Sequence, residues 1–129
     1  MNGTNYLLDT HSFVFWLLEE KSLSKKVLKI LQKPENNFFI SSMSILEIQY
    51  LVEIGRLEIE LGDIFSYIDS TPNFNILAFD RPALIESLKL NSHRDPFDRI
   101  IVATAQAYKL KLLTKDLRIL KTFPKLAIW

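Results

Sequence analysis

Short apolar runs alternate with longer helical patterns along almost the whole chain, and this alternation restricts the possible fold more than any other feature. The expected strands cover residues 6–8, 38–40, 75–79, 110–114 and 126–129. The expected helices fill the intervals, at residues 11–18, 24–31, 44–54, 62–70, 80–88, 95–108 and 117–123. Because a helix between two strands returns the chain to the same end of a sheet, this order predicts an α/β domain with a mainly parallel central sheet flanked by helices.

The length of 129 residues suits one domain, and 48% apolar residues are enough for one buried core. We expect a single domain over residues 1–129, with residues 1–5 as a short flexible lead. The chain has no Cys, which excludes disulfides and thiolate metal sites. It also has no apolar run of the roughly 18 residues that a membrane span needs. We therefore expect a cytoplasmic protein without a membrane partner.

Charge is unevenly distributed along the chain, although the net charge is only +1. Residues 1–93 hold eight Lys and Arg against twelve Asp and Glu, whereas residues 94–129 hold eight against three. Such asymmetry is consistent with an anionic ligand near the basic part, and equally with lysines that solvate exposed faces.

Four carboxylates stand where an expected strand ends or where the following helix begins. They are Asp9, Glu47, Asp98 and Asp116. In an open parallel sheet these junctions meet at one edge, and ligands bind in the crevice beyond the carboxyl ends of the strands. Four acids gathered there would repel one another, and at least one pKa would rise unless a cation neutralised them. Asp9 is the most informative, because an acid inside an apolar run is costly without a partner.

Oxygen ligands without His or Cys companions suit a hard ion, such as Mg²⁺ or Mn²⁺. Such an ion activates water and stabilises an in-line displacement at phosphorus. The placement of the acids therefore favours a metal-dependent reaction at a phosphate.

Three of the acids also have an ordinary structural explanation, and the sequence alone leaves both explanations open. Ser44 and Glu47 have the spacing of a capping box at a helix start. Asp98 follows Asp95 in another favourable helix start, and acids are stabilised near a helix N-terminus. Asp116 has the position of an N-cap for the last helix.

Other kinds of catalytic site have little support. His11 and His93 are the only histidines, and their separation does not fit a zinc site. The three glycines are too far apart for a phosphate-binding loop, and no Gly-x-Ser-x-Gly motif occurs. The aromatic residues Phe13, Phe15 and Trp16 are expected to belong to the core, and the alternative is that one edge of this cluster receives a partner helix.

The chain resembles the PIN-domain family, and most closely the VapC toxins of bacterial toxin–antitoxin modules, from about residue 6 to residue 129. The resemblance rests on Leu8-Asp9-Thr10-His11, Ser44-Ile45-Leu46-Glu47-Ile48, His93-Arg94-Asp95-Pro96-Phe97-Asp98-Arg99 and Leu113-Thr114-Lys115-Asp116. The match departs at Leu46, where many relatives have Trp. The resemblance implies a three-layer PIN-like fold.

The resemblance also implies a Mg²⁺- or Mn²⁺-dependent endoribonuclease that a cognate VapB-type antitoxin holds inactive, and that forms a homodimer. On the family pattern the catalytic and metal-binding acids are Asp9, Glu47, Asp98 and Asp116. The supporting residues are Thr114, Asp95 and Arg99. We expect Asp98 to be the principal helix acid and Asp95 to cap the helix. The residues proposed to hold the RNA backbone are Arg99, Lys115 and Arg118, although Arg99 has pairing with a site acid as its alternative.

Acid placement and resemblance together predict that water attacks the scissile phosphate in line, which leaves 5′-phosphate and 3′-hydroxyl ends. Part of the antitoxin is expected to occupy a groove near helix 11–18, with a basic side chain that reaches the acids. Three rival hypotheses are an inactive PIN-like module that binds RNA or protein, a receiver-type phosphoacceptor domain, and a phosphotransfer enzyme of the haloacid dehalogenase type. The last two classes of protein need a second acid close to the first one. In this chain Asp9 is followed by Thr10 and His11.

Overall fold

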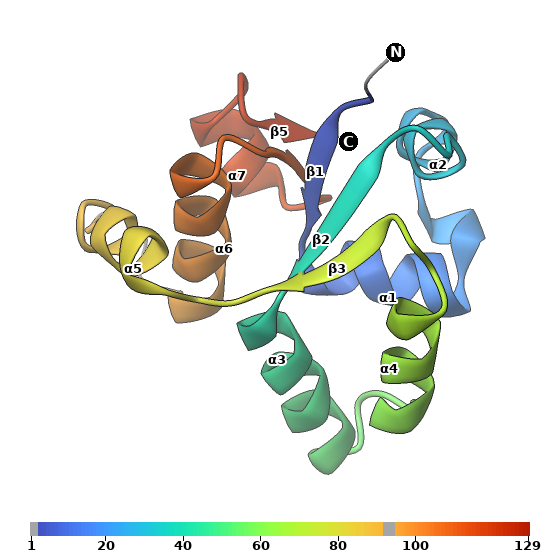
Figure 1. Ribbon diagram of the computed structural model, residues 1–129. Helices are drawn as coiled ribbons and strands as arrows, with labels where there is room; N and C mark the ends of the chain where they lie inside the picture. The colour runs from blue at the N-terminus through green and yellow to red at the C-terminus, as the bar shows by residue number, and fades with distance from the viewer. Residues whose placement is uncertain (1–2, 92–94) are drawn as a thin grey trace.

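The computed structural model describes residues 3–91 and 95–129. Its strands form one five-stranded sheet in the order β3-β2-β1-β4-β5, and all neighbouring strands are parallel (Figure 1). The strands are β1 Asn5–Leu8, β2 Asn37–Ser41, β3 Phe74–Leu77, β4 Lys111–Leu113 and β5 Ala127–Ile128. The expected α/β class with a parallel sheet is confirmed.

The helices occupy the intervals that the sequence pattern predicts. They are α1 Thr10–Leu18, α2 Lys25–Leu31, α3 Ser42–Glu53, α4 Leu61–Asp69, α5 Arg81–Leu88, α6 Pro96–Ala107 and α7 Leu117–Thr122, and a short 3₁₀ helix η1 covers Glu20–Ser22. Predicted and observed boundaries agree within two residues, whereas η1 was not expected. Such small shifts reflect the fraying of element ends.

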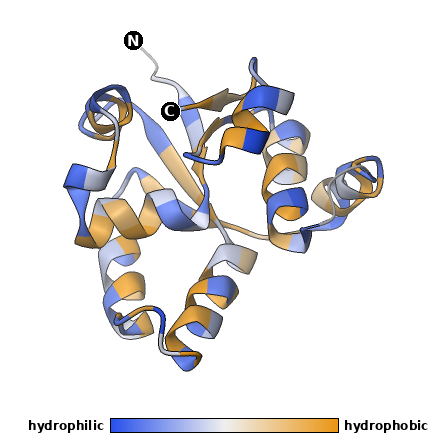
Figure 2. Ribbon diagram, turned by 180° about the vertical axis from the view of Figure 1, so that it is seen from behind, coloured by the Kyte–Doolittle hydropathy of each residue, from blue (hydrophilic) through white to orange (hydrophobic). Residues whose placement is uncertain are grey.

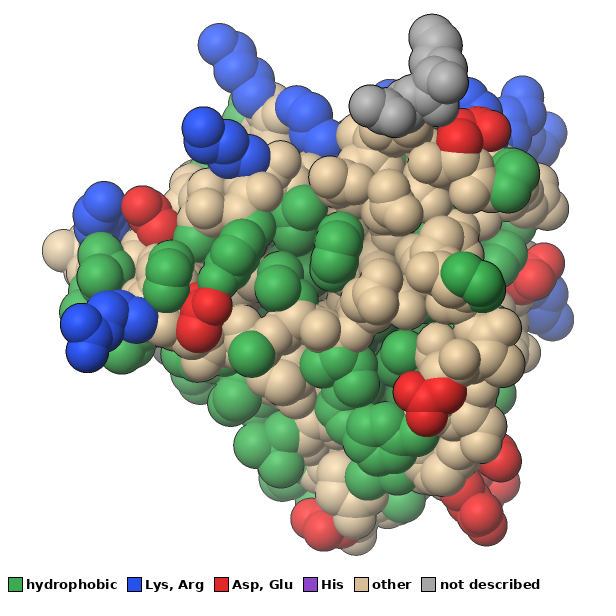
Figure 3. Space-filling model, in the orientation of Figure 1, with side chains coloured by type: hydrophobic (Ala, Val, Ile, Leu, Met, Phe, Trp, Pro, Cys, Tyr) green, Lys and Arg blue, Asp and Glu red, His purple; other side chains and the backbone are tan. Residues whose placement is uncertain are grey.

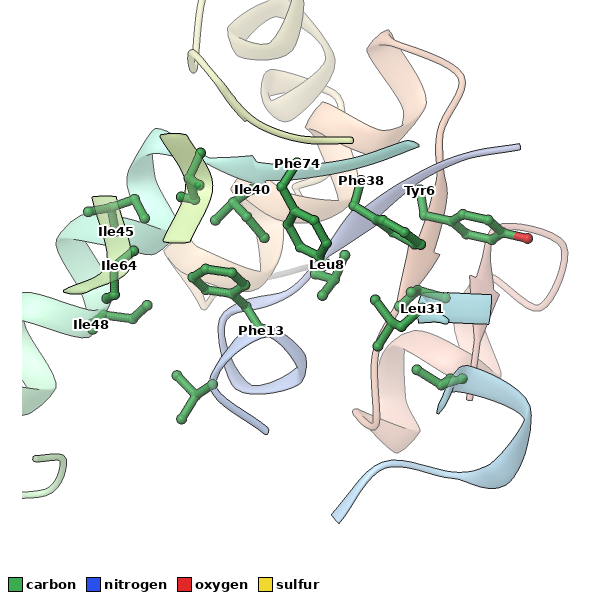
Figure 4. Close-up of a cluster of buried hydrophobic side chains, with 14 of the residues drawn as sticks. Tyr6, Leu8, Phe13, Leu31, Phe38, Ile40, Ile45, Ile48, Ile64 and Phe74 are labelled. Carbon is green, nitrogen blue, oxygen red and sulfur yellow. The ribbon is translucent and has the colours of Figure 1, made fainter. Parts of the chain in front are cut away.

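Alternating side chains of the strands divide the core into two halves, one on each face of the sheet. Tyr6 and Leu8 of β1 point to the face covered by α1, α2, α3 and α4 (Figure 4). Leu7 points to the opposite face, where it packs with Val102 of α6 and Ile119 of α7. Figure 2 shows hydrophobic residues on the strands of the sheet and on the helices around it. The result is the expected arrangement of three layers.

The strand order places a topological switch point between β1 and β4. From β1 the chain continues through β2 to β3 on one side, and it later returns to β4 and β5 on the other side. Ligands of open parallel sheets bind in the crevice at such a point, beyond the carboxyl ends of the strands. Receiver domains have the order 2-1-3-4-5 instead. The observed order therefore contradicts the receiver hypothesis.

Gly55 ends α3, as the sequence predicts. Its φ of +76° lies in the left-handed region that favours glycine. The Gly55 N–H donates to the Val52 carbonyl at 3.1 Å, and the Arg56 N–H donates to the Leu51 carbonyl at 2.9 Å. These two bonds form a Schellman motif, which satisfies the last carbonyls of the helix.

The N-terminal segment joins the sheet earlier than expected. Asn5 already belongs to β1, and the Thr4 N–H donates to Asn36 Oδ1 at 3.1 Å. The predicted flexible lead is therefore wrong for residues 4 and 5, while residues 1 and 2 lie outside the described residues. None of the helices in the described ranges is long and apolar enough to cross a membrane.

Candidate active site

The four acids identified in the sequence line one cavity of about 210 Å³ at the switch point. Asp9 follows β1, Glu47 lies in α3, Asp98 in the first turn of α6, and Asp116 precedes α7. The N-terminal ends of α1, α3 and α6 converge at this edge of the sheet (Figure 1). The other lining residues are Thr10, His11, Asp95, Phe97 and Ile101. Residues more than 100 positions apart in sequence thus share one site.

Asp9 is held by hydrogen bonds to both carboxylate oxygens. The Ser12 N–H donates to Oδ1 at 2.8 Å, and the Thr114 hydroxyl donates to Oδ2 at 2.5 Å. Burial raises the pKa of Asp9, and these hydrogen bonds act in the opposite direction because they stabilise the charged form. Asp9 is both the N-cap of α1 and an acid that faces the cavity.

Glu47 is bound by Thr10, not by the start of its own helix. The Thr10 hydroxyl donates to Glu47 Oε1 at 2.5 Å. The N-cap of α3 is Ser41, whose hydroxyl oxygen accepts from the Met43 N–H at 3.1 Å. Ser44 is buried inside the helix, and its hydroxyl has no hydrogen-bond partner among the described residues. The capping-box explanation for Ser44 and Glu47 is therefore wrong.

Asp95 and Asp98 have different environments. Asp95 Oδ1 accepts from the Phe97 N–H at 2.9 Å and from the Asp98 N–H at 3.1 Å, so Asp95 caps α6 as predicted. The Asp98 carboxylate accepts no hydrogen bond from residues 3–91 or 95–129. Its partial burial, followed by the negative charges of Asp95, Asp116, Asp9 and Glu47, raises the pKa of Asp98 from 3.8 to about 6. Burial and the neighbouring carboxylates therefore both disfavour the charged form of Asp98.

Asp116 combines a capping role with a position at the site. Its Oδ1 accepts from the Ile119 N–H at 3.0 Å, which starts α7. Its own N–H donates to the Thr114 hydroxyl oxygen at 3.1 Å. Thr114 therefore links Asp9 and Asp116 through one hydroxyl group.

None of the basic residues described in the C-terminal part forms an ion pair with a site acid. Arg99 Nε donates to the Ser87 carbonyl at 2.7 Å and so joins α6 to α5. Within the described ranges Arg99 forms no ion pair with a site acid, which contradicts that alternative. Lys115 lines a neighbouring cavity with Asp9, and Arg118 is exposed on α7. His93 and Arg94 of the third motif lie outside the described residues.

The oxygen atoms of the four carboxylates are ligands that suit a hard cation, although the acids do not form a compact ligand group. The second oxygens, Oε2 of Glu47 and Oδ2 of Asp116, accept no hydrogen bond within the described ranges. A cation would offset the repulsion that raises the pKa of Asp98. No three His, Asp or Glu side chains among residues 3–91 and 95–129 already stand as a metal-binding group.

A larger groove adjoins the acids and was only partly expected. It has a volume of about 600 Å³ and shares His11, Glu47, Asp95 and Phe97 with the acidic cavity. Its walls come mainly from α1 and α3. The apolar lining residues are Val14, Phe15 and Leu18 of α1, Tyr50 and Leu51 of α3, and Leu57 of the loop after α3. Phe13 is fully buried as expected, but Phe15 is only partly buried and faces this groove. The apolar pattern of α1 does not separate these two roles, since both positions look equally hydrophobic.

Comparison with known proteins identifies the family and similar folds. The family model of the PIN domain matches residues 6–125, a range that contains all four acids. The chain is 26% identical to ribonuclease VapC22 of Mycobacterium tuberculosis over 125 residues, with 90% of each chain covered. Two solved structures, each covered to 98% in both chains, have similar folds. VapBC2 from Rickettsia felis bound to a DNA fragment from their promoter has a TM-score of 0.70 and 20% identity. DNA-bound VapBC from Salmonella typhimurium has a TM-score of 0.69 and 18% identity.

Proposed function

Because the chain belongs to the PIN-domain family, we propose that it is a metal-dependent endoribonuclease and the toxin component of a VapBC-type toxin–antitoxin system. The observation that carries this proposal is the convergence of Asp9, Glu47, Asp98 and Asp116 on one cavity at the switch point of the sheet. The relative named as a ribonuclease and the VapBC structures support the same assignment. We propose one PIN-like domain over residues 1–129 that acts on RNA in the cytoplasm.

The metal would be held by the four acids, with Mg²⁺ or Mn²⁺ as the ion that suits oxygen ligands. When bound, the ion supplies charge stabilisation at the phosphate and lowers the pKa of water. Thr10 and Thr114 orient Glu47 and Asp9 through their hydroxyl groups. These two hydrogen bonds restrict the side chains of Glu47 and Asp9 beside the cavity before a ligand binds.

The proposed reaction is hydrolysis, with water and not the 2′-hydroxyl as the attacking group. The bond from phosphorus to the 3′ oxygen breaks, a bond to the water oxygen forms, and a proton goes to the 3′ oxygen. The products carry 5′-phosphate and 3′-hydroxyl ends. A 2′,3′-cyclic phosphate product would contradict this mechanism.

The central experiment compares RNA cleavage by antitoxin-free protein in Mg²⁺ or Mn²⁺ and in EDTA. Total tRNA and a generic single-stranded RNA are the substrates, and the Asp98→Asn variant controls for contaminating nuclease. We expect metal-dependent cleavage that the variant loses. A folded protein that cuts neither RNA, and whose melting temperature does not rise with the metal, would favour the inactive binding module.

The groove beside the acids is the proposed site of the VapB-type antitoxin. Its apolar walls suit an amphipathic helix or an extended tail. Its shared boundary with the acidic cavity allows a basic antitoxin side chain to pair with Glu47 or Asp95. Inhibition would then follow from occupation of the position that the metal needs.

The antitoxin proposal is tested by co-expression with the neighbouring reading frame, followed by pull-down. Leu18 is 52% exposed at the groove, so Leu18→Glu should preserve folding while it places a charge against the apolar face of the partner. We expect the variant to lose stable binding and to keep its nuclease activity. If the parent protein and Leu18→Glu retain the partner equally, the antitoxin binds at another surface.

We also propose that the protein forms a homodimer through an apolar surface on α5 and β3. The exposed apolar side chains in this region are Ile76, Leu84, Ile85 and Leu88. Figure 3 shows hydrophobic side chains gathered on the face that carries α5 and β3. A contiguous apolar patch of this kind is typical of an interaction surface.

A further inference from the structure

A third cavity adjoins both the acidic cavity and the groove, with which it shares lining residues. It has a volume of about 270 Å³ and is lined by Asp9, His11, Phe15, Asp98, Lys115 and Asp116. We call it the Phe15 cavity. Because it shares three acids with the acidic cavity, a ligand whose phosphate lies at the acids would place its neighbouring group in the Phe15 cavity.

Two aromatic rings and one ammonium group form the non-acidic wall of this cavity. The ring centroids of His11 and Phe15 are 6.5 Å apart, with an angle of 32° between the rings. The ring centroids of Phe15 and Trp129 are 6.5 Å apart, with an angle of 60° between the rings, and this edge-to-face contact supports the Phe15 ring. Lys115 Nζ lies 5.9 Å from the Phe15 centroid. The wall therefore offers aromatic surface and positive charge next to a set of carboxylates.

We propose that the Phe15 cavity binds the base of an unpaired nucleotide that flanks the scissile phosphate, while Lys115 pairs with the next phosphate along the strand. This proposal rests on the proposed ribonuclease function. Bases stack on aromatic side chains with little sequence preference, and Lys provides the phosphate contact. The volume lies just below the roughly 300–1,000 Å³ of small-molecule sites, which suits one base.

The substrate class follows from the shape of this site. A base within a duplex is stacked on both faces and paired at its edge, so it cannot enter the Phe15 cavity without leaving the helix. Recognition at this cavity therefore selects single-stranded segments, loops or bulges of RNA. The nucleotide beside the cleaved bond is the one that must be unpaired.

The Phe15 cavity adjoins the larger groove, because His11 and Phe15 line both. Each site is lined by three carboxylates and one basic side chain, which is Arg56 in the groove and Lys115 in the Phe15 cavity. Lys115 lines the Phe15 cavity together with Asp9, Asp98 and Asp116, so its ammonium group is the phosphate contact available beside these acids.

The test measures binding, so that it does not depend on cleavage. A single-stranded RNA carrying the fluorescent base 2-aminopurine is titrated with Asp98→Asn protein in Mg²⁺, because this variant is expected not to cleave the RNA. The added substitutions are His11→Ala, Phe15→Leu and Lys115→Gln. The matched controls are Tyr50→Leu, an exposed aromatic of the groove, and Lys121→Gln, an exposed lysine of α7.

We expect stacking to quench the 2-aminopurine fluorescence in the parent protein. His11→Ala and Phe15→Leu should each weaken binding by roughly ten-fold and reduce the quenching. Lys115→Gln should retain the quenching, weaken binding and lower the salt dependence by about one phosphate contact. The controls should stay within about two-fold of the parent. Since His11 is exposed, its substitution tests the cavity even if Phe15→Leu lowers the melting temperature.

Two results would overturn the subsite: no binding of single-stranded RNA, or quenching that both aromatic substitutions leave unchanged. Cleavage by the same variants with Asp98 restored is then measured in Mg²⁺. Metal-dependent cleavage, with binding and quenching unchanged by His11→Ala and Phe15→Leu, would reject the subsite and support the nuclease. The aromatic effect without any cleavage removes the nuclease and keeps a base-binding site.

Discussion

At the scale of single residues, hydroxyl groups and not positive charges hold Glu47 and Asp9 in place. Thr10 donates to Glu47, and Thr114 donates to Asp9. The ion pair found in the described ranges joins Lys89 to Glu86, away from the site. The carboxylates are therefore oriented but remain uncompensated. This arrangement leaves their negative charge available to a cation.

Removing the charge of Asp98 should stabilise the metal-free protein and abolish cleavage. The pKa of Asp98 is about 6, above its ordinary 3.8, so the folded state disfavours the charged form. This destabilisation is complete above pH 6, declines as the pH falls and is absent below about pH 4. Because the group is partly solvated and its helix N-terminus favours an acid, we expect Asp98→Asn to add only about 1 kcal/mol at pH 8, or about 3 °C in Tm.

Thermal unfolding of both proteins at pH 8, 6 and 4 measures this effect, and RNA cleavage should fall roughly 100-fold or more. Asp95→Asn is the matched control, because Asn is also a good N-cap. It should preserve most of the cleavage. A larger loss of cleavage in Asp95→Asn than in Asp98→Asn would reverse the assignment of the two acids.

Thr114→Val should damage the site without a large change of shape. Val lacks the hydroxyl that donates to Asp9 Oδ2 and accepts from the Asp116 N–H. We expect a loss of about 1–3 kcal/mol in the free energy of unfolding, because two partly buried polar groups lose a partner. Cleavage should fall by roughly ten-fold as well. Urea unfolding and cleavage rates measure both, and Thr114→Ser should restore most of each.

At the scale of elements, local signals set most boundaries and leave the acids with two roles. Asp9, Asp95 and Asp116 are N-caps of α1, α6 and α7. The capping explanations for Asp95 and Asp116 were therefore correct, yet both residues also line the acidic cavity. Capping and a position at the site are compatible, because helix starts face the carboxyl ends of parallel strands.

Substitution by Ala should change the free energy of unfolding in opposite directions at Gly55 and Gly62. Gly55→Ala places a side chain at φ +76°, and we expect it to cost about 1 kcal/mol. Gly62 lies in the first turn of α4, and an added Cβ there meets nothing within 4 Å. Gly62→Ala should therefore stabilise the protein by about 0.5 kcal/mol. Denaturant unfolding of the two variants checks the signs, and RNA cleavage should change in neither.

At the scale of the whole molecule, α5 stands out because it carries an apolar outer surface. Two hydrogen bonds connect α5 with α6 at their ends and along their contact. Arg99 donates to the Ser87 carbonyl, and Tyr108 donates to Asp80. The side chains left outside are Leu84, Ile85 and Leu88, beside Ile76 of β3. A helix that is tied to α6 in this way and carries this surface is suited to contact a second copy of the chain.

Leu88→Glu should therefore convert the proposed dimer to a monomer. Leu88 is 66% exposed, so folding should tolerate the charge while an apolar interface should not. Leu117→Glu is the matched control, since Leu117 is 81% exposed on α7 and lies outside this surface. Light scattering after size exclusion gives the masses. A monomeric parent protein, or a dimer unaffected by Leu88→Glu, would rule out this interface.

The sequence by itself determined the class of the fold, the order of its elements and the acids worth testing. These depend on local information: apolar periodicity, caps such as Ser24 and Asp80, and the glycine at position 55. Such signals act within a few residues, so they can be recognised without knowing what packs against them.

Only the tertiary structure decided which of these residues meet. The order of the strands brings β1 beside β4, so Thr114 reaches Asp9 across 105 positions, and Thr10 reaches Glu47 across 37. It also leaves Phe15 partly exposed beside the acids while Phe13 is buried. Neither result is encoded locally, because hydrogen bonds and burial depend on contacts between segments that are distant in sequence.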